Sequence, residues 1–255
     1  MKIEGCRAMV VGGASGMARA TAERIAKGGG SVAILDQSSS AGTEVAAAIG
    51  GNASFHPCDI TEFEAVEGVL AEAVGALGGL DAAINTAGGG VAMRTLSKQG
   101  PHSLDAFRKV IDLNLVATFN LNRLQALHMS RGEPNEDGER GVIINTASIA
   151  AFEGQIGQVA YTASKAGIAG MCLTMARDLG SLGIRVNAIA PSLFSTGITS
   201  AIPEDRAALL TQDAAFPKRM GRPDEYARLA VAIIENPMLN GGTLRLDAGQ
   251  RFAPK

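Results

Sequence analysis

The sequence has few of the residues that build disulfide frameworks or metal sites. Its 255 residues include three cysteines, three histidines and no tryptophan. Cys6, Cys58 and Cys172 are odd in number and irregular in spacing, so we expect neither a disulfide framework nor a metal site. The scattered histidines are interpreted as structural or solvent-exposed residues: His56, His102 and His128.

The sequence also lacks a large net charge and a long apolar run. A formal net charge of −2 at pH 7 gives no basic footprint for nucleic acid. No apolar run approaches the roughly 20 residues of a membrane span. The first residues enter an apolar strand pattern almost at once, without signal or transit character. We therefore expect a cytoplasmic protein that has no membrane span and does not bind nucleic acid.

Glycine and apolar residues are abundant instead. The chain contains 32 glycines, and 46% of its residues are hydrophobic, a balance typical of a packed α/β domain with many tight turns. A chain of this length can bury roughly three quarters of its extended surface. We find no internal repeat, linker or second domain, so residues 1–255 are expected to form a single domain.

Strand patterns alternate with helical patterns along the chain. Strands are expected at 8–11, 31–35, 54–58, 80–85, 141–146 and 184–190. Helices are expected from the first glycine-rich turn to Ile25 and at 41–49, 62–77, 104–129 and 159–179, with a loop at 88–101. This alternation predicts an α/β fold: a Rossmann-type doubly wound parallel sheet of about seven strands with helices on both faces.

Ligands of such sheets bind beyond the carboxyl ends of the strands. The residues expected there are Gly12, Asp36, Asp59, Asn85, Ser148 and Pro191. The turn from Gly12 to Ala18 follows a strand and opens a helix. Its glycines let the backbone approach a pyrophosphate, and the helix N-terminus presents free N–H groups. This context predicts a dinucleotide site, which a lone glycine-rich turn would not.

Asp36 ends the second strand, twenty residues after Gly16. A carboxylate there can bind both ribose hydroxyls of NAD and would repel the additional phosphate of NADP. Ser15 and Gln37 are neutral and offer that phosphate no cation. An ordinary acidic loop residue is the alternative, but the spacing favours NAD as the cofactor.

Tyr161 and Lys165 lie one turn apart on the same face of an expected helix. A free phenol titrates near pH ~10, and a nearby ammonium would lower that pKa toward neutrality. Ser148 can hydrogen-bond the oxygen that gains or loses the proton. Tyr-x-x-x-Lys also arises by chance, and Ser148 could cap a helix or satisfy a turn. The cofactor turn and the strand–helix junction favour a catalytic site for proton transfer.

The chain resembles the short-chain dehydrogenase/reductase family over essentially its whole length. The residues that carry the resemblance are the turn Gly12–Ala18, Asn85, Asn114, Ser148, Tyr161, Lys165 and Pro191-Ser192. Stretches such as GVIINTASIAAFEGQIGQVAYTASK and IRVNAIAPSLFSTGI are similar to the 3-hydroxyacyl-CoA dehydrogenases of that family. The resemblance implies an oxidoreductase that exchanges a hydride between NAD and a hydrophobic secondary alcohol. A 3-hydroxyacyl-CoA of fatty acid metabolism is the expected substrate, and a hydroxysteroid is another.

The family also implies roles for individual residues. Tyr161 would be the acid/base, Lys165 would tune it and bond the nicotinamide ribose, and Ser148 would position the substrate oxygen. Asn114 would hold a water that links Lys165 to solvent, and Gln155 would line the substrate pocket. The residues expected to contact NAD are Gly12, Ser15, Gly16, Met17, Asp36, Asp59, Ile60, Asn85, Thr86, Ala87, Gly88, Tyr161, Lys165, Pro191, Phe194 and Thr196.

The sequence departs from the family pattern at four positions. Val11 stands where the family usually has Thr, and Thr86, in place of the second Asn, could be a compensating change. Ala18 replaces the third Gly of the turn, where Ala is tolerated. Ser192 replaces the usual Gly after Pro191 and could stiffen the lid expected from 192 to 222.

Two other functions and two assembly states remain open. Reduction of 3-oxoacyl thioesters in lipid synthesis normally uses NADPH, which Asp36 disfavours. A binding scaffold without catalysis is hard to reconcile with intact Ser148, Tyr161 and Lys165. The resemblance implies a homotetramer in which helices at 112–129 and 159–179 pair across a two-fold axis. A monomer in which both helices face only their own sheet is the alternative.

Overall fold

A seven-stranded parallel sheet forms the centre of the molecule, in the order β3-β2-β1-β4-β7-β8-β9. The computed structural model describes residues 1–197 and 202–254. The strands are β1 (Arg7–Val11), β2 (Ser31–Asp36), β3 (Ala53–Pro57), β4 (Ala82–Asn85), β7 (Gly141–Thr146), β8 (Ile184–Pro191) and β9 (Thr243–Leu246). Every neighbouring pair in this sheet runs parallel, which confirms the predicted Rossmann-type fold.

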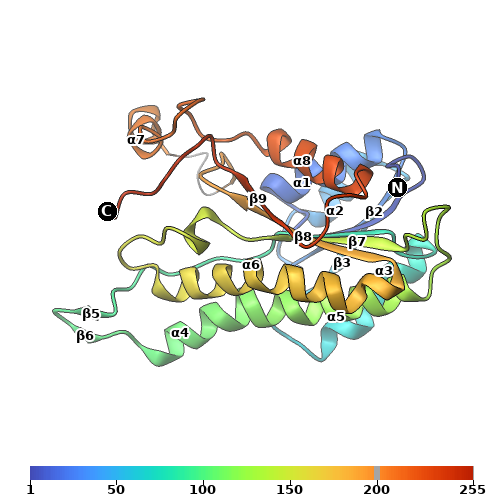
Figure 1. The fold of residues 1–255 in the computed structure, drawn as a ribbon, viewed down its shortest axis with the longest axis horizontal. Helices are drawn as coiled ribbons and strands as arrows, with labels where there is room; N and C mark the ends of the chain where they lie inside the picture. The colour runs from blue at the N-terminus through green and yellow to red at the C-terminus, as the bar shows by residue number, and fades with distance from the viewer. Residues whose placement is uncertain (198–201, 255) are drawn as a thin grey trace.

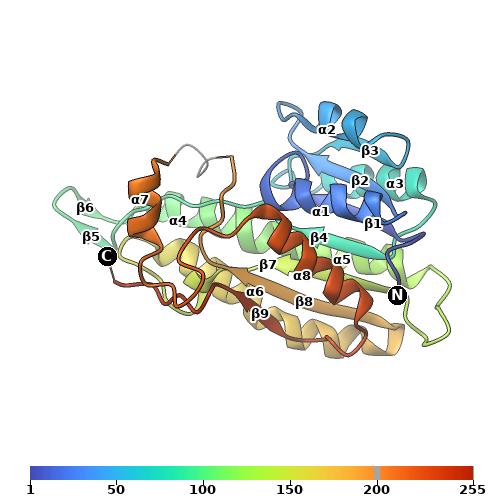
Figure 2. The same cartoon turned by 90° about the horizontal axis from the view of Figure 1, so that it is seen from above.

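Helices cover both faces of the sheet (Figures 1 and 2). On one face lie α1 (Gly16–Lys27), α2 (Gly42–Ile49) and α8 (Pro223–Glu235); on the other lie α3 (Ala65–Leu77), α4 (Leu104–Ile111), α5 (Ala117–Ser130) and α6 (Val159–Leu179). The short α7 (Glu204–Leu210) lies at one end of the molecule, beyond the sheet (Figure 2). The layers are those of a doubly wound fold, as predicted.

Two hydrophobic cores, one on each face, hold the layers together. Strand β7 contributes to both, because successive side chains of a strand point to opposite faces. Ile143 packs in the core under α3, α5 and α6, whereas Val142 and Ile144 pack in the core under α1 and α8. All six residues of β7 are buried, as is typical of a strand covered on both sides.

The predicted elements up to residue 190 have their observed ends within three residues of those expected. Within the segment expected as a loop, β5 (Leu96–Ser97) and β6 (Gly100–Pro101) form a short hairpin, so that prediction was incomplete. The long helical pattern is two helices, α4 and α5, joined by a π-helical turn over Asp112–Val116. Such wide turns are frequent at functional sites. No element was predicted after residue 190, where α7, α8 and β9 occur.

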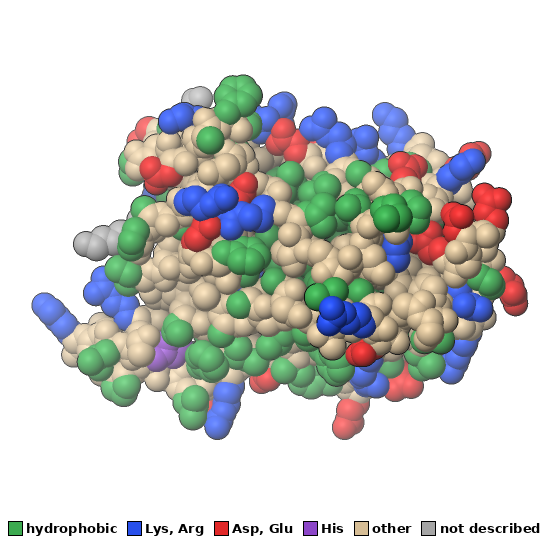
Figure 3. Space-filling model, viewed as in Figure 1, with side chains coloured by type: hydrophobic (Ala, Val, Ile, Leu, Met, Phe, Trp, Pro, Cys, Tyr) green, Lys and Arg blue, Asp and Glu red, His purple; other side chains and the backbone are tan. Residues whose placement is uncertain are grey.

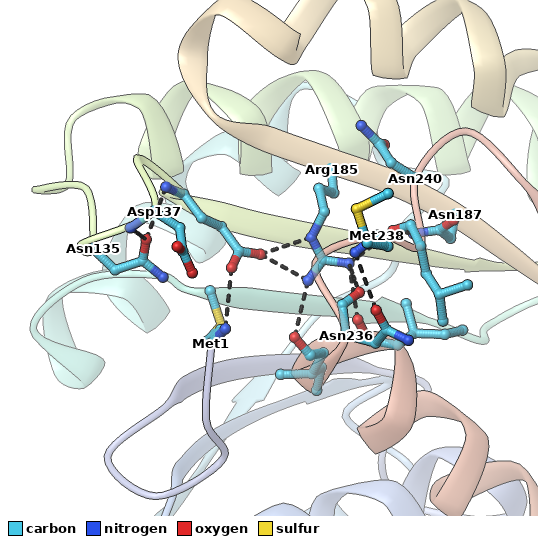
Figure 4. A network of polar contacts seen from close by, with 12 residues as sticks. Met1, Asn135, Asp137, Arg185, Asn187, Asn236, Met238 and Asn240 are labelled. Carbon is cyan, nitrogen blue, oxygen red and sulfur yellow. Dashed lines mark hydrogen bonds and ion pairs between the residues drawn. The ribbon is translucent and has the colours of Figure 1, made fainter.

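A buried ion pair closes the amino end of the sheet (Figure 4). The Arg185 guanidinium lies 2.7 Å from the Glu139 carboxylate, which also accepts a hydrogen bond from the Met1 ammonium at 3.2 Å. Arg185 donates further to carbonyl oxygens at and beyond the end of α8: those of Ile233, Ile234, Asn236 and Leu239. Because the last carbonyls of a helix have no partner within it, Arg185 joins β8 to the end of α8.

The described residues contain no helix that is long and apolar enough to cross a membrane. Within the lid expected from 192 to 222, residues 198–201 lie outside the described residues.

Candidate active site

A cavity of about 420 Å³ opens at the carboxyl ends of β1, β2 and β4. Its volume lies in the range typical of ligand pockets. Eleven of the residues expected to contact NAD line it: Gly12, Ser15, Gly16, Met17, Asp36, Asp59, Ile60, Thr86, Ala87, Gly88 and Thr196. Sequence reasoning missed Cys58 and Leu113, which also line the cavity and which directly precede Asp59 and Asn114.

The glycine-rich turn forms a close-fitting wall of this cavity. Gly12 and Gly16 have φ angles of +81° and +54°, which other residues rarely adopt. A Cβ atom on Gly12 would lie 2.9 Å from the hydroxyl oxygen of Thr86 and 3.0 Å from the backbone nitrogen of Ala87. Ser15 is the N-cap residue of α1, and its side chain makes no capping hydrogen bond. The N-terminal end of α1 therefore faces the cavity, an arrangement that fits a pyrophosphate.

Asp36 ends β2 and lies in the wall of the cavity, as predicted. One carboxylate oxygen accepts a hydrogen bond from the backbone N–H of Ala14 at 3.0 Å, and the other accepts one from Gln37 at 2.8 Å. These bonds hold the carboxylate where a ribose could reach it. At the next strand end, hydrogen bonds from the Thr61 hydroxyl and N–H lower the pKa of Asp59.

Five residues expected to contact NAD do not line this cavity: Asn85, Tyr161, Lys165, Pro191 and Phe194. The Asn85 amide instead lies in a buried cluster, where its nitrogen donates to side-chain oxygens of Asn122, Gln125 and Asn145 at 2.9–3.0 Å. Asn85 is the last residue of β4, and its side chain points into the core rather than past the strand end, so its contact with NAD remains a prediction. Pro191 is buried at the end of β8, and Phe194 packs beside Gly221 and lines a different cavity.

Ser148 and Tyr161 come together although they stand thirteen positions apart in the sequence. Burial of the phenol raises the pKa of Tyr161, and hydrogen bonding with Ser148 opposes that rise. The Ser148 hydroxyl also accepts a 3.1 Å hydrogen bond from the N–H of Ala150, at the start of a 3₁₀ turn over Ile149–Ala151. The capping role considered for Ser148 is therefore present together with its contact to Tyr161.

Lys165 is buried and points to the end of β7. Its Nζ atom donates a 2.8 Å hydrogen bond to the carbonyl oxygen of Thr146 and lies 5.6 Å from the centroid of the Tyr161 ring. Burial lowers the pKa of Lys165 to about 8. The expectation that the pKa of Tyr161 is lowered toward neutrality was wrong for this structure, where that pKa is raised. Removal of the phenol from water outweighs the favourable interactions around it.

Asn114 lies in the π-helical turn between α4 and α5 and is fully buried. Its amide nitrogen donates to the carbonyl oxygens of Gly89 and Val110 at 2.7 and 2.8 Å, and its oxygen accepts from the N–H of Gly89 at 3.2 Å. A Cβ atom on Gly88 would lie 2.5 Å from that oxygen and 3.5 Å from Nζ of Lys165. Asn114 and Lys165 thus both lie beside Gly88, and the water through which Asn114 would link Lys165 to solvent remains a prediction.

Gln155 lies outside the cofactor cavity. It lines a second, more open cavity of about 630 Å³, together with residues 94–96 before and within β5 and the first turns of α6. Its amide nitrogen donates to the carbonyl oxygen of Ala253 at 3.1 Å. The substrate role expected for Gln155 remains a prediction.

Among residues 1–197 and 202–254, no group of three or more His, Cys, Asp or Glu side chains could hold a metal ion. The three cysteines are buried and unpaired, and burial raises the pKa of each thiol, for Cys58 and Cys172 to about 11. Raised thiol pKa values make these cysteines poor nucleophiles.

Known proteins match the chain over its full length. A family model described as short chain dehydrogenase matches residues 7–207. The chain is 49% identical to 3-hydroxyacyl-CoA dehydrogenase type-2 of Drosophila melanogaster, over 99% of this chain and 100% of that protein. A crystal structure of 3-hydroxyacyl-CoA dehydrogenase type-2 from Mycobacterium avium superimposes with a TM-score of 0.94 and 42% identity, covering 100% of both chains. A 7α-hydroxysteroid dehydrogenase complexed with NADH and 7-oxo glycochenodeoxycholic acid superimposes with a TM-score of 0.88 and 28% identity, covering 100% of this chain and 97% of that one.

Proposed function

Since the chain belongs to the short-chain dehydrogenase family, and is therefore an oxidoreductase that uses a nicotinamide dinucleotide, we propose that it oxidises 3-hydroxyacyl-CoA to 3-oxoacyl-CoA with NAD. One observation carries the proposal: Ser148, Tyr161 and Lys165 lie together near a cavity whose wall holds the Asp36 carboxylate. The choice of an acyl-CoA substrate is supported by the names of the similar proteins.

The cavity residues would hold the cofactor in one orientation. The turn at Gly12–Met17 would bind its pyrophosphate, and Asp36 its adenine ribose, whose two hydroxyls match the two carboxylate oxygens. The bound nicotinamide supplies the acceptor of the substrate hydride. An additional phosphate on that ribose would meet the negative charge of Asp36, which is the reason for proposing NAD rather than NADP.

The catalytic residues would move the proton. Ser148 would hold the substrate oxygen by a hydrogen bond while the Tyr161 phenolate accepts the hydroxyl proton in oxidation, or the Tyr161 phenol donates its proton in reduction. Because burial raises the pKa of Tyr161, the phenol is protonated at neutral pH in the structure described here. Oxidation requires the loss of that proton, which positive charge on Lys165 would favour.

A hydroxysteroid is the second candidate substrate, because one of the similar structures is a hydroxysteroid dehydrogenase. The test is a panel of 3-hydroxyacyl-CoA esters and hydroxysteroids assayed with NAD and with NADP, with the absorbance of NADH or NADPH as the readout. We expect the highest kcat/KM for a 3-hydroxyacyl-CoA with NAD. Turnover of steroids alone, or preference for NADP, would contradict the proposal.

We further propose that the protein is a homotetramer that pairs through α5 and α6. Apolar side chains on these helices are exposed, with Phe119 at 49%, Leu127 at 43% and Leu173 at 49%. Figure 3 shows hydrophobic side chains along the edge of the molecule formed by α4 and α5. An exposed apolar face of this kind favours association. Sedimentation at micromolar concentration tests the proposal, and a monomer of 26.1 kDa would contradict it.

The cytoplasmic location remains a prediction that cell fractionation can check.

A further inference from the structure

We propose that the C-terminal segment 250–254 is a positioning element of the active site, which holds the substrate loop, defined here as residues 152–158, through ion pairs of Arg251. This role presupposes the proposed function, because the substrate loop carries Gln155, the residue expected to line the substrate pocket. The ion pair of Arg251 with Glu153 joins two parts of the chain that lie about a hundred residues apart.

The substrate loop links two catalytic residues but has little structure of its own. It runs between Ser148 and Tyr161. Among the described residues from 148 to 158, the only regular element is the 3₁₀ turn Ile149–Ala151. The internal hydrogen bonds found among these described residues join Gln155 and Gln158. The N–H of Gln155 donates to the side-chain oxygen of Gln158 at 3.1 Å, and Gln158 donates from its N–H to the Gln155 carbonyl oxygen at 3.0 Å and from its side-chain nitrogen to the Gln155 side-chain oxygen at 3.4 Å. A loop with so few internal bonds depends on other segments for its position.

The C-terminal segment provides such bonds at two consecutive residues. The N–H of Ile156 donates to the carbonyl oxygen of Pro254 at 3.1 Å. The side-chain nitrogen of Gln155 donates to the carbonyl oxygen of Ala253, also at 3.1 Å. The segment therefore holds both the backbone of the loop and the side chain that faces the second cavity.

Four charged side chains form ion pairs that join the C-terminal segment to the substrate loop. We call them the charge cluster: Glu153, Arg245, Asp247 and Arg251. Arg245 binds Glu153 through two hydrogen bonds of 2.8 and 3.1 Å and reaches Asp247 at 2.6 Å. Arg251 lies 3.3 Å from Glu153 and 3.1 Å from Asp247. Two anions and two cations balance, and the cluster joins β9, the C-terminal segment and the substrate loop.

The first residue of the C-terminal segment, Gln250, is bound to α7. Gln250 is 3% exposed, and its side-chain nitrogen donates to the carbonyl oxygen of Leu210 at 2.8 Å. In both Figures 1 and 2 the C-terminus lies at the same end of the molecule as α7 and the β5–β6 hairpin. The segment thus links the last residue of α7 to the substrate loop.

Arg251 is suited to position the loop rather than to stabilise the whole fold. Its side chain is 60% exposed, and ion pairs at such sites contribute about 0–1 kcal/mol. Loss of this contribution leaves the free energy of unfolding of the whole protein almost unchanged. The free energy of opening a loop with few internal bonds is, however, about as small as the contribution of the ion pair. Loss of the ion pair therefore increases the population of the open loop.

The test compares Arg251→Ala with Arg251→Lys and with the control Arg24→Ala. Arg24 forms a comparable ion pair with Asp224, at 3.2 Å and 41% exposure, between α1 and α8. The hydrogen-exchange rate of the Ile156 amide reports on opening of the substrate loop, and the KM for a 3-hydroxyacyl-CoA in steady-state kinetics reports on substrate binding. For Arg251→Ala we expect Ile156 exchange to rise about two- to fivefold, the range that ion pairs of up to about 1 kcal/mol allow. The KM for the alcohol should rise by a similar factor, while kcat, the KM for NAD and the unfolding midpoint stay the same.

Three further results complete the test. Arg251→Lys should lie between the parent and Arg251→Ala in both Ile156 exchange and KM, and Arg24→Ala should leave both as in the parent. Because salt screens exposed charges, 1 M salt should raise Ile156 exchange and KM in the parent but not in Arg251→Ala. Unchanged Ile156 exchange overturns the proposal, as does faster exchange with an unchanged KM. A parent enzyme that oxidises no 3-hydroxyacyl-CoA overturns the proposed function, and the substrate role of Arg251 with it.

Discussion

The hydroxyl of Thr86 donates a 2.8 Å hydrogen bond to the backbone carbonyl oxygen of Val11, joining the ends of β4 and β1. Both residues depart from the family pattern, in which a Thr usually stands at position 11 and an Asn at position 86. In this chain the threonine hydroxyl therefore stands at the end of β4 instead of the end of β1, and a hydrogen bond still joins the two strand ends. Thr86 also lies 2.9 Å from where a Cβ atom on Gly12 would be, so this bond supports the cofactor turn.

Thr86→Val should weaken NAD binding about fivefold, because one neutral hydrogen bond is worth about 1 kcal/mol. Thr86→Ser keeps the hydroxyl and should bind NAD as the parent does. Titration calorimetry with NAD measures both affinities. Equal losses in the two variants would show that the methyl group, not the hydroxyl, supports the turn.

Tyr161→Phe should reduce kcat by about a hundred- to ten-thousand-fold, the usual contribution of a positioned acid or base. The phenol oxygen is the proton carrier, whereas the ring keeps its packing against Gly90. NAD affinity should therefore change little. The measurements are kcat and NAD binding for the same preparation. Substantial remaining activity, or a parallel loss of NAD binding, would contradict the catalytic assignment.

Asp36→Ala should shift cofactor choice toward NADP, because it removes both the acceptors for the ribose hydroxyls and the repulsion of a phosphate. The ratio of kcat/KM for NAD to that for NADP should fall at least about tenfold, which corresponds to about 1.4 kcal/mol. Asp36→Asn is the matched control, since it removes the charge and keeps an acceptor. An unchanged ratio in both variants would mean that Asp36 does not contact the ribose.

Lys165 should make stability depend on pH. Its folded-state pKa of about 8 lies below the ordinary 10.5, so between these values the unfolded chain binds a proton that the folded chain does not. Stability conferred by this position therefore rises with pH across that window, by roughly 3 kcal/mol. Buried thiols and Tyr161, with raised pKa values, act in the opposite sense at high pH.

The comparison of the parent with Lys165→Met isolates the Lys165 contribution. Denaturant unfolding from pH 7 to 10.5, at one protein concentration, should show the parent gaining stability relative to the variant above pH 8. A difference that does not vary with pH would contradict the burial of a charged Lys165.

Arg185→Met should destabilise the fold by about 3–5 kcal/mol, the usual result of leaving one partner of a buried ion pair alone. Glu139 then keeps only the Met1 ammonium, and the carbonyls at the end of α8 lose their donor. Adding Glu139→Gln should recover part of the loss. Unfolding free energies of the three proteins measure this, and no recovery in the double variant would contradict it. NAD affinity should stay the same, because Arg185 lies at the amino end of the sheet.

The sequence by itself determined the order of the elements up to residue 190 apart from the β5–β6 hairpin, the parallel sheet and most of the cofactor site. Apolar strands such as Val142–Ile144, the turn at Gly12–Gly16 and the one-turn spacing of Tyr161 and Lys165 are local features, readable because neighbouring residues define them. Asp36 was predictable for the same reason, since it is the last residue of β2.

Tertiary structure alone decided what depends on distant residues or on exclusion of water. The Asn85 side chain turns into a cluster with Asn122 and Asn145, and the tail residue Ala253 binds Gln155 across 98 positions. The pKa of Tyr161 is raised rather than lowered, because the folded chain removes the phenol from water. Sequence spacing places residues along one element. Burial and long-range contacts arise only when the elements pack, and they determine where a side chain points and how readily it gives up a proton.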